Sequence, residues 1–182
     1  DKFGPDLAFM GIKVAEGGKQ RADSVYNGVS KLNEEIDFVA IHDAARPCLA
    51  SRWIEDVFAT SIKTGAAILA TPVVSTLKRI NENQCVTGTV DRNSLWEAQT
   101  PQVFSRTMLA KAFTKDTHRN ATDEAQLVEA AGHAVTVVRG SPMNIKITSK
   151  EDVRLAEQIL KVLPKPTLNN QNHPFSDGDI WR

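Results

Sequence analysis

Short apolar runs alternate with segments of helical spacing in the first part of the chain. Residues 8–14, 38–42 and 66–70 are mostly apolar and of strand length, whereas residues 23–32 and 51–64 carry apolar side chains at a helical period. Short buried runs favour strands, and a period near 3.6 favours helices that cover a sheet. This order predicts an α/β fold with a Rossmann-like, mostly parallel sheet and helices on both faces.

Capping residues mark the expected helix boundaries. Asp23 or Ser24 is suited to cap the first helix, and Ser51 is suited to cap the second. Ser149 and Asp152 have the spacing of a capping box in front of the last helix, which is the most clearly periodic segment of the chain.

The middle of the chain interrupts this rhythm. Residues 76–80 and 85–90 are strand-like around the polar segment 81–84, so we expect a projecting hairpin arm over about residues 73–96. Such an arm has little core of its own and is usually stabilised by a partner. Regular α/β order then resumes with two helices and a strand, expected at residues 105–113, 122–131 and 134–138.

Size and composition suit one domain. The 182 residues are 41% hydrophobic, and we assign residues 1–164 to the domain and the Asn- and Pro-rich residues 165–182 to a C-terminal tail. The 22 basic and 22 acidic residues cancel, so neither nucleic acid nor a membrane is an expected partner. Cys48 and Cys85 are too few for a disulfide framework, and no apolar run reaches the length of a membrane span, which favours the cytoplasm.

Polar clusters fall at the predicted strand ends and loops. In an open α/β sheet such ends converge on one crevice, where ligands bind. The clusters occupy residues 17–24, residues 42–47, residues 89–92 together with 99–102, and residues 144–148.

The first two clusters are suited to anions. Glycine-loop N–H groups, Arg21 and a helix N-terminus favour an anion or the polar edge of a base, although a structural turn with a routine cap is the other interpretation. Asp43 directly follows a buried strand and can bind Mg²⁺ or a sugar hydroxyl, while Arg46 can bind phosphate. The alternative there is a loop salt bridge with His42 packed inside.

Further cations would suit a phosphoryl transfer. Lys78 and Arg92 on the hairpin, and Lys146 near the last strand, add positive charge that a triphosphate and a phosphomonoester need, although each alone is typical of surface charge. A Ser-His-Asp order or a cysteine nucleophile with a paired base is not apparent, so a hydrolase has little support.

Taken together, these segments resemble the methylerythritol phosphate cytidylyltransferase family from about Gly17 to Leu160. The matching segments occur in the family's order and near its spacing: GGKQRADSVYNG, IHDAARP, TLKRI, TVDR, LWEAQTPQVF, TDEAQLVE and NIKIT.

The resemblance implies roles for individual residues. Gly18, Lys19 and Ser24 lie where the family recognises the cytosine ring, and Arg21 joins them as a nucleotide-binding candidate. Asp43 and Ala44 lie where the family has residues beside the ribose, metal and substrate, and Lys146 lies near the phosphates. The positions that hold the methylerythritol phosphate in the family correspond to Arg46, Thr76, Arg92, Thr100 and Thr122.

The implied reaction joins CTP to a polyol phosphate. A phosphate oxygen of the acceptor attacks the α-phosphorus of CTP and pyrophosphate leaves, with Mg²⁺ spreading the charge and Asp43 as its ligand. Asp43 and Lys146 are the catalytic candidates. In the family the hairpin arm crosses to a second subunit, so a homodimer is implied in which Thr76 and Arg92 serve the partner's site.

One family feature is missing before Gly17. The family begins with a strand and a glycine-rich loop that carries an Arg and a Lys around the triphosphate, and residues 1–16 do not supply it. We therefore expect an N-terminally truncated chain, nearly inactive in isolation, from an enzyme of the cytoplasm, or of the plastid in a plant or alga. A transferase for ribitol 5-phosphate is the nearest alternative, which Ala45 argues against, and a non-catalytic dimeric remnant is another.

Overall fold

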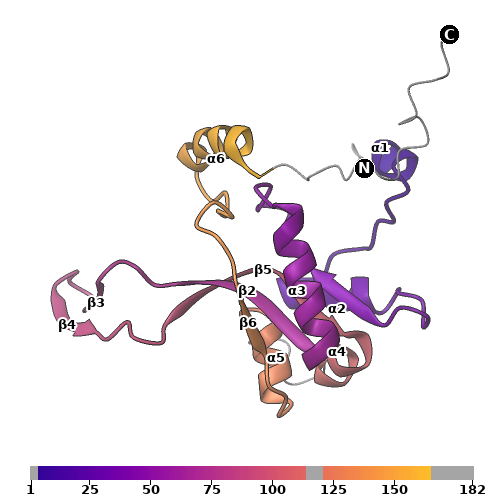
Figure 1. Ribbon diagram of the computed structural model, residues 1–182, viewed down its shortest axis with the longest axis horizontal. Coiled ribbons are helices and arrows are strands. Elements are labelled where there is room, and N and C mark those ends of the chain that lie inside the picture. The colour runs from indigo at the N-terminus through magenta and orange to yellow at the C-terminus, as the bar shows by residue number, and fades with distance from the viewer. Residues whose placement is uncertain (1–3, 114–120, 165–182) are drawn as a thin grey trace, which may run out of the picture.

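The computed structural model describes residues 4–113 and 121–164. Its elements in chain order are α1 (Gly4–Phe9), α2 (Arg21–Val29), β1 (Phe38–Ile41), α3 (Ser51–Thr64), β2 (Ala66–Pro72), β3 (Leu77–Ile80), β4 (Val86–Val90), β5 (Trp96–Ser105), α4 (Arg106–Ala112), α5 (Glu124–Ala130), β6 (Thr136–Arg139) and α6 (Lys150–Val162) (Figure 1).

The central sheet has the strand order β1-β5-β2-β6. Strand β5 is antiparallel to both β1 and β2, while β2 and β6 are parallel. Strands β1, β2 and β6 therefore run in one direction, which agrees with the predicted mostly parallel sheet, and β5 runs against them in the middle.

Strand β5 corrects the sequence prediction for residues 99–102, which were assigned to a strand end or loop. Gln99, Thr100 and Gln102 are buried inside this strand, although polar residues are uncommon there. Their side chains all form hydrogen bonds, which offsets the cost of taking them out of water. Because a buried polar strand lacks the apolar run of an ordinary buried strand, the pattern concealed it.

Helices cover both faces of the sheet, as predicted. On one face, Phe104 and Ile68 belong to a core that includes residues of α4 and α5, and side chains of α2 pack against it. On the other face, Leu69 and Val103 pack with Val57 of α3. Apolar burial on both faces fixes the sheet as the central layer.

A hairpin lies between β2 and β5 in the chain. Strands β3 and β4 pair antiparallel as a separate two-stranded sheet that projects from the body (Figure 1). Ile80 and Val86 on these strands are exposed. The role of the arm in joining two subunits stays a prediction.

The predicted strand at residues 8–14 is wrong. Helix α1 covers the start of this segment and buries no residue, and the side chains of Ile12 and Val14 are exposed. An apolar run becomes a strand only where a ladder partner and a core receive it, and residues 8–14 pair with no described strand.

Helix boundaries follow the predicted chemistry in part. Gln20 is the N-cap of α2, in place of Asp23 or Ser24, and Asp23 completes a capping box from inside the first turn. Ala50 is the N-cap of α3, so Ser51 is that helix's first residue and not its cap. Local side-chain hydrogen bonding can stabilise a helix end from either position, so composition alone left the boundary open.

The capping box of α6 is confirmed. Oγ of Ser149 accepts from the N–H of Asp152 over 3.3 Å, and the Asp152 carboxylate accepts from the N–H of Ser149 over 2.8 Å. The tail assigned to residues 165–182 lies outside the described residues. Among the helices of the described ranges, none combines the length and apolar character that crossing a bilayer needs.

Candidate functional site

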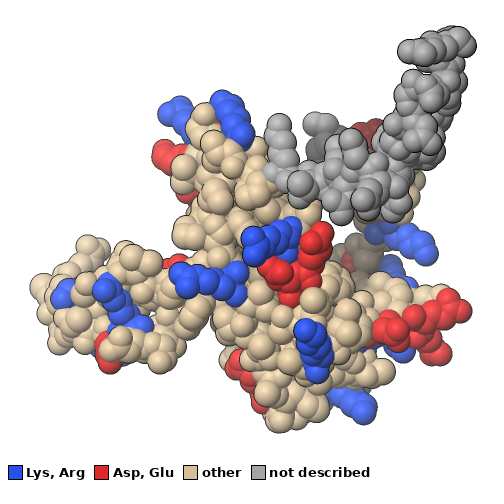
Figure 2. All heavy atoms as spheres, in the orientation of Figure 1, with Lys and Arg blue, Asp and Glu red and all other residues tan. Residues whose placement is uncertain are grey.

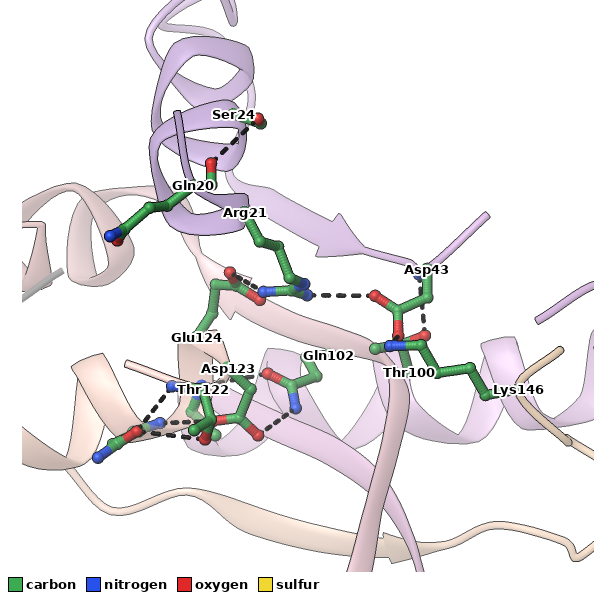
Figure 3. Close-up of polar contacts among 12 residues, drawn as sticks. Gln20, Arg21, Ser24, Asp43, Thr100, Gln102, Thr122, Asp123, Glu124 and Lys146 are labelled. Carbon is green, nitrogen blue, oxygen red and sulfur yellow. Dashed lines mark hydrogen bonds and ion pairs between the residues drawn. The ribbon is translucent and has the colours of Figure 1, made fainter. Parts of the chain in front are cut away.

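Asp43 lies at the centre of a cluster of cations beyond the end of β1. Its Oδ1 is 3.3 Å from Nη2 of Arg21, and its Oδ2 is 3.0 Å from Nζ of Lys146 (Figure 3). Nε of Arg46 is farther away, 3.8 Å from Oδ2. The fold thus brings three predicted site cations to one predicted site carboxylate.

These cations decide the charge of Asp43. Burial by itself would raise the pKa of its carboxyl group. The hydrogen bond and charge of Lys146, followed by those of Arg21, outweigh burial and hold the pKa of Asp43 below its ordinary value. Asp43 is therefore ionised at neutral pH.

Thr100 and His42 fix the backbone around Asp43. The N–H of Asp43 donates to Oγ1 of Thr100 over 3.0 Å, and that oxygen is 3.0 Å from Nδ1 of His42. Nε2 of His42 is 3.0 Å from the carbonyl oxygen of Arg46, which can only accept, so Nε2 carries a proton. The His42 side chain is exposed, which contradicts the alternative interpretation in which His42 packs inside the protein.

Asn144 connects the last loop to this cluster. Its side chain is fully buried and donates to the carbonyl oxygen of Thr100 over 2.9 Å and to Oε1 of Gln99 over 3.3 Å. Its own carbonyl oxygen accepts from Nη1 of Arg46 over 2.7 Å. Burial lowers the pKa of Arg46, and the charge of Asp43 opposes this effect. The loop that carries Lys146 is thereby held against β5.

Arg21 bridges Asp43 to a buried carboxylate that sequence reasoning missed. Its Nη1 donates to Oε1 of Glu124 over 2.6 Å, and Glu124 is 1% exposed. Burial would lower the pKa of Arg21, but the hydrogen bond and charge of Glu124 raise it above its ordinary value. An acidic residue at a helix start is usually a dipole partner, so the residue pattern contains no separate signal for this pair.

A cavity of about 250 Å³ lies in front of these groups. Its walls include Gln99 and Gln102 of β5 and Asp123, the N-cap of α5. Six sequence-predicted site residues line it together: Arg21, Asp43, Arg46, Thr100, Thr122 and Lys146. Part of each predicted cluster therefore reaches this cavity, although residues 17–20 and 89–92 do not line it.

A second cavity of about 570 Å³ adjoins the first and extends toward the base of the arm. Arg46, Gln99 and Lys146 line both cavities, and Val74 and Ser75 belong to the second alone. Basic and acidic side chains are interspersed over the visible face of the molecule (Figure 2).

The glycine loop lies apart from the first cavity. Gly18 donates its N–H to Oγ of Ser24 over 2.9 Å, and Ser24 in turn donates to the carbonyl oxygen of Gln20 over 3.2 Å. Among the residues labelled on α2 and its cap in Figure 3, Arg21 is the one that points toward Asp43. A Cβ on Gly18 would meet Cβ of Asp23 at 2.1 Å, so glycine is needed here for close packing.

Four more candidates line neither cavity. Ala44 and Lys19 lie in exposed loop positions, while Thr76 and Arg92 belong to the arm. Arg92 donates to the carbonyl oxygen of Val74 at the base of the arm. Within one chain, the arm candidates are therefore separate from the cluster around Asp43.

The sequence of this chain matches one protein family over most of its length. Residues 4–162 match the 2-C-methyl-D-erythritol 4-phosphate cytidylyltransferase family. A relative of that name from Clostridioides difficile is 42% identical over 165 residues, which cover 90% of this chain and 69% of the relative. The bifunctional enzyme IspD/IspF of Desulfotalea psychrophila is 45% identical over 155 residues, covering 85% of this chain and 40% of that enzyme.

Solved structures give the same grouping. The 2-C-methyl-D-erythritol 4-phosphate cytidylyltransferase of Francisella tularensis superposes with a TM-score of 0.75 at 37% identity, covering 82% of this chain and 72% of that one. A 4-diphosphocytidyl-2C-methyl-D-erythritol synthase has a TM-score of 0.79, also at 37% identity, covering 88% and 77%. The match therefore includes most of this chain but only part of each relative.

Proposed function

Because this chain belongs to the 2-C-methyl-D-erythritol 4-phosphate cytidylyltransferase family, we propose that it transfers CMP from CTP to 2-C-methyl-D-erythritol 4-phosphate and releases pyrophosphate. The observation that carries the proposal is the shared cavity in which Arg21, Arg46 and Lys146 surround Asp43. Two anionic substrates that repel each other need such a concentration of fixed positive charge.

The proposed chemistry is a direct displacement at phosphorus. A phosphate oxygen of the acceptor forms a bond to the α-phosphorus of CTP while the bond to the leaving pyrophosphate oxygen breaks. Arg46 and Lys146 both line the cavity and would neutralise the charge that develops in the transition state. The side chain of Lys146 is 46% exposed, so it can turn from Asp43 toward a ligand.

On the nucleotide side, the proposed contacts come from the glycine loop and from the loop after β1. Gly18, Lys19 and Ser24 would recognise the cytosine ring, and Asp43 with Ala44 would lie beside the ribose. The loop lies outside the cavity around Asp43, which suits a nucleotide extended from its base to its phosphates.

On the acceptor side, the proposed contacts come from two subunits. Arg46, Thr100 and Thr122 line the cavity of one chain and would hold the polyol phosphate there. Thr76 and Arg92 line neither of the two cavities described above, and they would complete the same site from the arm of a second chain. The exposed apolar side chains of the arm support this homodimer.

Mg²⁺ is the proposed cation of the reaction. The described ranges hold no group of three or more His, Cys, Asp or Glu side chains suited to a metal. Asp43 fits a site of the kind in which a single carboxylate and substrate phosphates share the ion, because Mg²⁺ is usually held by one or two carboxylates plus phosphates. When bound, the ion would neutralise charge on the triphosphate.

Pyrophosphate release tests the proposal. The full-length protein is given CTP and Mg²⁺ with either 2-C-methyl-D-erythritol 4-phosphate or ribitol 5-phosphate as acceptor. Release with the first acceptor alone is expected, release with ribitol 5-phosphate alone would move the protein to a different substrate class, and no release with either would overturn the assignment. A preparation carrying Asp43→Asn serves as the matched background.

Two broader assignments accompany the proposal. Residues 1–164 are taken as the transferase domain with residues 73–96 as its arm. The cytoplasm is the proposed compartment, or the plastid for a plant or alga. A rice relative that is 40% identical over 151 residues, or 82% of this chain and 51% of the relative, is named as chloroplastic.

A further inference from the structure

Glu124 is a buried carboxylate to which the proposed chemistry gives no task. Its Oε1 accepts a hydrogen bond from Arg21 over 2.6 Å, and its Oε2 has no hydrogen-bond partner within residues 4–113 and 121–164. Burying a carboxylate is costly unless a cation and hydrogen bonds compensate. Arg21 is therefore the group that makes Glu124 tolerable at this depth.

The guanidinium of Arg21 is divided between two carboxylates. Its Nη1 donates to Glu124 over 2.6 Å and its Nη2 donates to Oδ1 of Asp43 over 3.3 Å (Figure 3). An arginine beside a single carboxylate commonly forms two parallel hydrogen bonds to it. Here the shorter bond to Glu124 uses Nη1 and the bond to Asp43 uses Nη2, so the two terminal nitrogens do not both face one carboxylate.

We propose that Glu124 is a positioning residue that, by holding Nη1 of Arg21, prevents an end-on, two-bond pairing of Asp43 with Nη1 and Nη2. Asp43 then meets Arg21 through Oδ1 alone, and Oδ2 faces Lys146 and the cavity. The expected effect on turnover rests on the proposed function. The competition of Asp43 and Glu124 for Arg21 rests on the geometry of the three side chains.

The same contact orders the wall of the cavity. Arg21 is the first residue of α2 and Glu124 is the first residue of α5, so their ion pair joins two helix starts that are 103 residues apart. Asp123, immediately before Glu124, caps α5 and accepts a hydrogen bond from Gln102 over 2.9 Å. A change at Glu124 is thus transmitted to Asp43 through Arg21.

A double-mutant cycle in stability tests the competition. Glu124→Gln, Asp43→Asn and the double variant are compared by urea unfolding, both in the native sequence and in an Arg21→Met background. We expect non-additivity of about 5-fold or more in the unfolding equilibrium constant when Arg21 is present, and additivity when it is absent. Glu129→Gln, on the exposed side of the same helix, is the matched control and should add independently of Asp43→Asn.

Additive effects in the native sequence would overturn the proposal, and so would a coupling that survives in the Arg21→Met background. Where Glu124→Gln does not fold, Arg21→Lys replaces it in the cycle, because lysine keeps the charge but has one nitrogen to share between two carboxylates. The side chain introduced by Arg21→Lys should then show a weaker coupling to Asp43 than the native arginine shows. An equal coupling contradicts the proposal.

A kinetic measurement separates positioning from a purely structural role. In a folded Glu124→Gln variant we expect kcat to fall roughly 10- to 100-fold, with the KM values for CTP and the acceptor changed less than about 3-fold. Native kcat in that variant would overturn the positioning role. If the native protein itself has no activity, the proposed function fails, and the stability cycle alone decides the inference.

Discussion

The backbone N–H of Asp43 donates a hydrogen bond to the hydroxyl of Thr100 over 3.0 Å. This bond joins the loop after β1 to the interior of β5, two segments that are 57 residues apart in the chain. Thr100 is 4% exposed, so its hydroxyl has protein partners in place of water. The position of the Asp43 carboxylate therefore depends on a neutral side chain as well as on the surrounding charges.

Replacing Thr100 by Val should destabilise the protein. The shape is nearly preserved, but the N–H of Asp43 loses its acceptor, and an unsatisfied group of this kind costs about 1–3 kcal/mol. Urea unfolding of Thr100→Val measures the loss. Thr136→Val, at a β6 position with no described side-chain hydrogen bond, should be close to neutral, and equal effects of the two changes would refute the role assigned to Thr100.

Replacing Arg46 by Ala should weaken acceptor binding. Arg46 is largely buried at 13% exposure and faces both cavities, so it is placed to contact the acceptor phosphate. We expect the KM for the polyol phosphate to rise about 10-fold or more, because a hydrogen bond to a charged group contributes about 1.5–3 kcal/mol. Steady-state kinetics with each substrate varied separately would measure the change in KM.

A matching rise in the KM for CTP argues against an acceptor-side role for Arg46. The control variant is Arg52→Ala, on the exposed side of α3, which should change neither the KM for CTP nor the KM for the polyol phosphate.

Replacing Asp43 by Asn should reduce turnover at least about 10-fold. The amide keeps the size of the side chain but removes the charge that Arg21, Lys146 and the proposed Mg²⁺ share. Initial rates over a series of Mg²⁺ concentrations would reveal whether the apparent affinity for the cation falls as well. Asp56→Asn, on the surface of α3, controls for the change of net charge. Unaltered rates in the Asp43 variant would leave it as a structural loop residue.

The capping box of α6 should make stability depend on pH. Hydrogen bonds from the backbone and side chains of Thr148 and Ser149 lower the pKa of Asp152 from 3.8 to about 2. A carboxyl group whose pKa is lower in the folded state stabilises the fold at pH values above its ordinary pKa, and this stabilisation is lost as the pH falls toward 2. The stability difference between the native protein and Asp152→Asn should therefore be largest near pH 6 and shrink below pH 4.

Urea unfolding at a series of pH values measures this dependence. Glu157→Gln, an exposed change on the same helix without a described partner, should show little difference from the native protein over the whole range. A constant difference for Asp152→Asn between pH 6 and pH 3 would contradict the cap.

The sequence predicted the parts of the fold whose signals are local. A helical period together with a cap located α6, and short apolar runs located β1 and β2. The apolar run at residues 8–14 misled because nothing in composition shows whether a neighbouring strand is available. Strand β5 was missed for the opposite reason, since its polar residues are satisfied by partners that are distant in the chain.

The candidate site divides in the same way. Asp43, Arg46 and Lys146 could be proposed because charged residues after predicted strands converge in an α/β sheet. Glu124 could not, because its importance depends on its burial and on its contact with Arg21 across more than half of the chain. Other candidates such as Thr76 were predicted only through a family resemblance, and the two cavities described above do not include them.

The arm is the segment of chain that connects the paired strands β2 and β5. Strands β2 and β5 are antiparallel neighbours, and Pro72 pairs with Trp96 at the point where the arm leaves the sheet. The entropy of closing a loop grows slowly with its length, so this connection can lengthen, shorten or change sequence at little cost to the strands it joins. The arm can therefore change its sequence and its contacts while the central sheet keeps its structure.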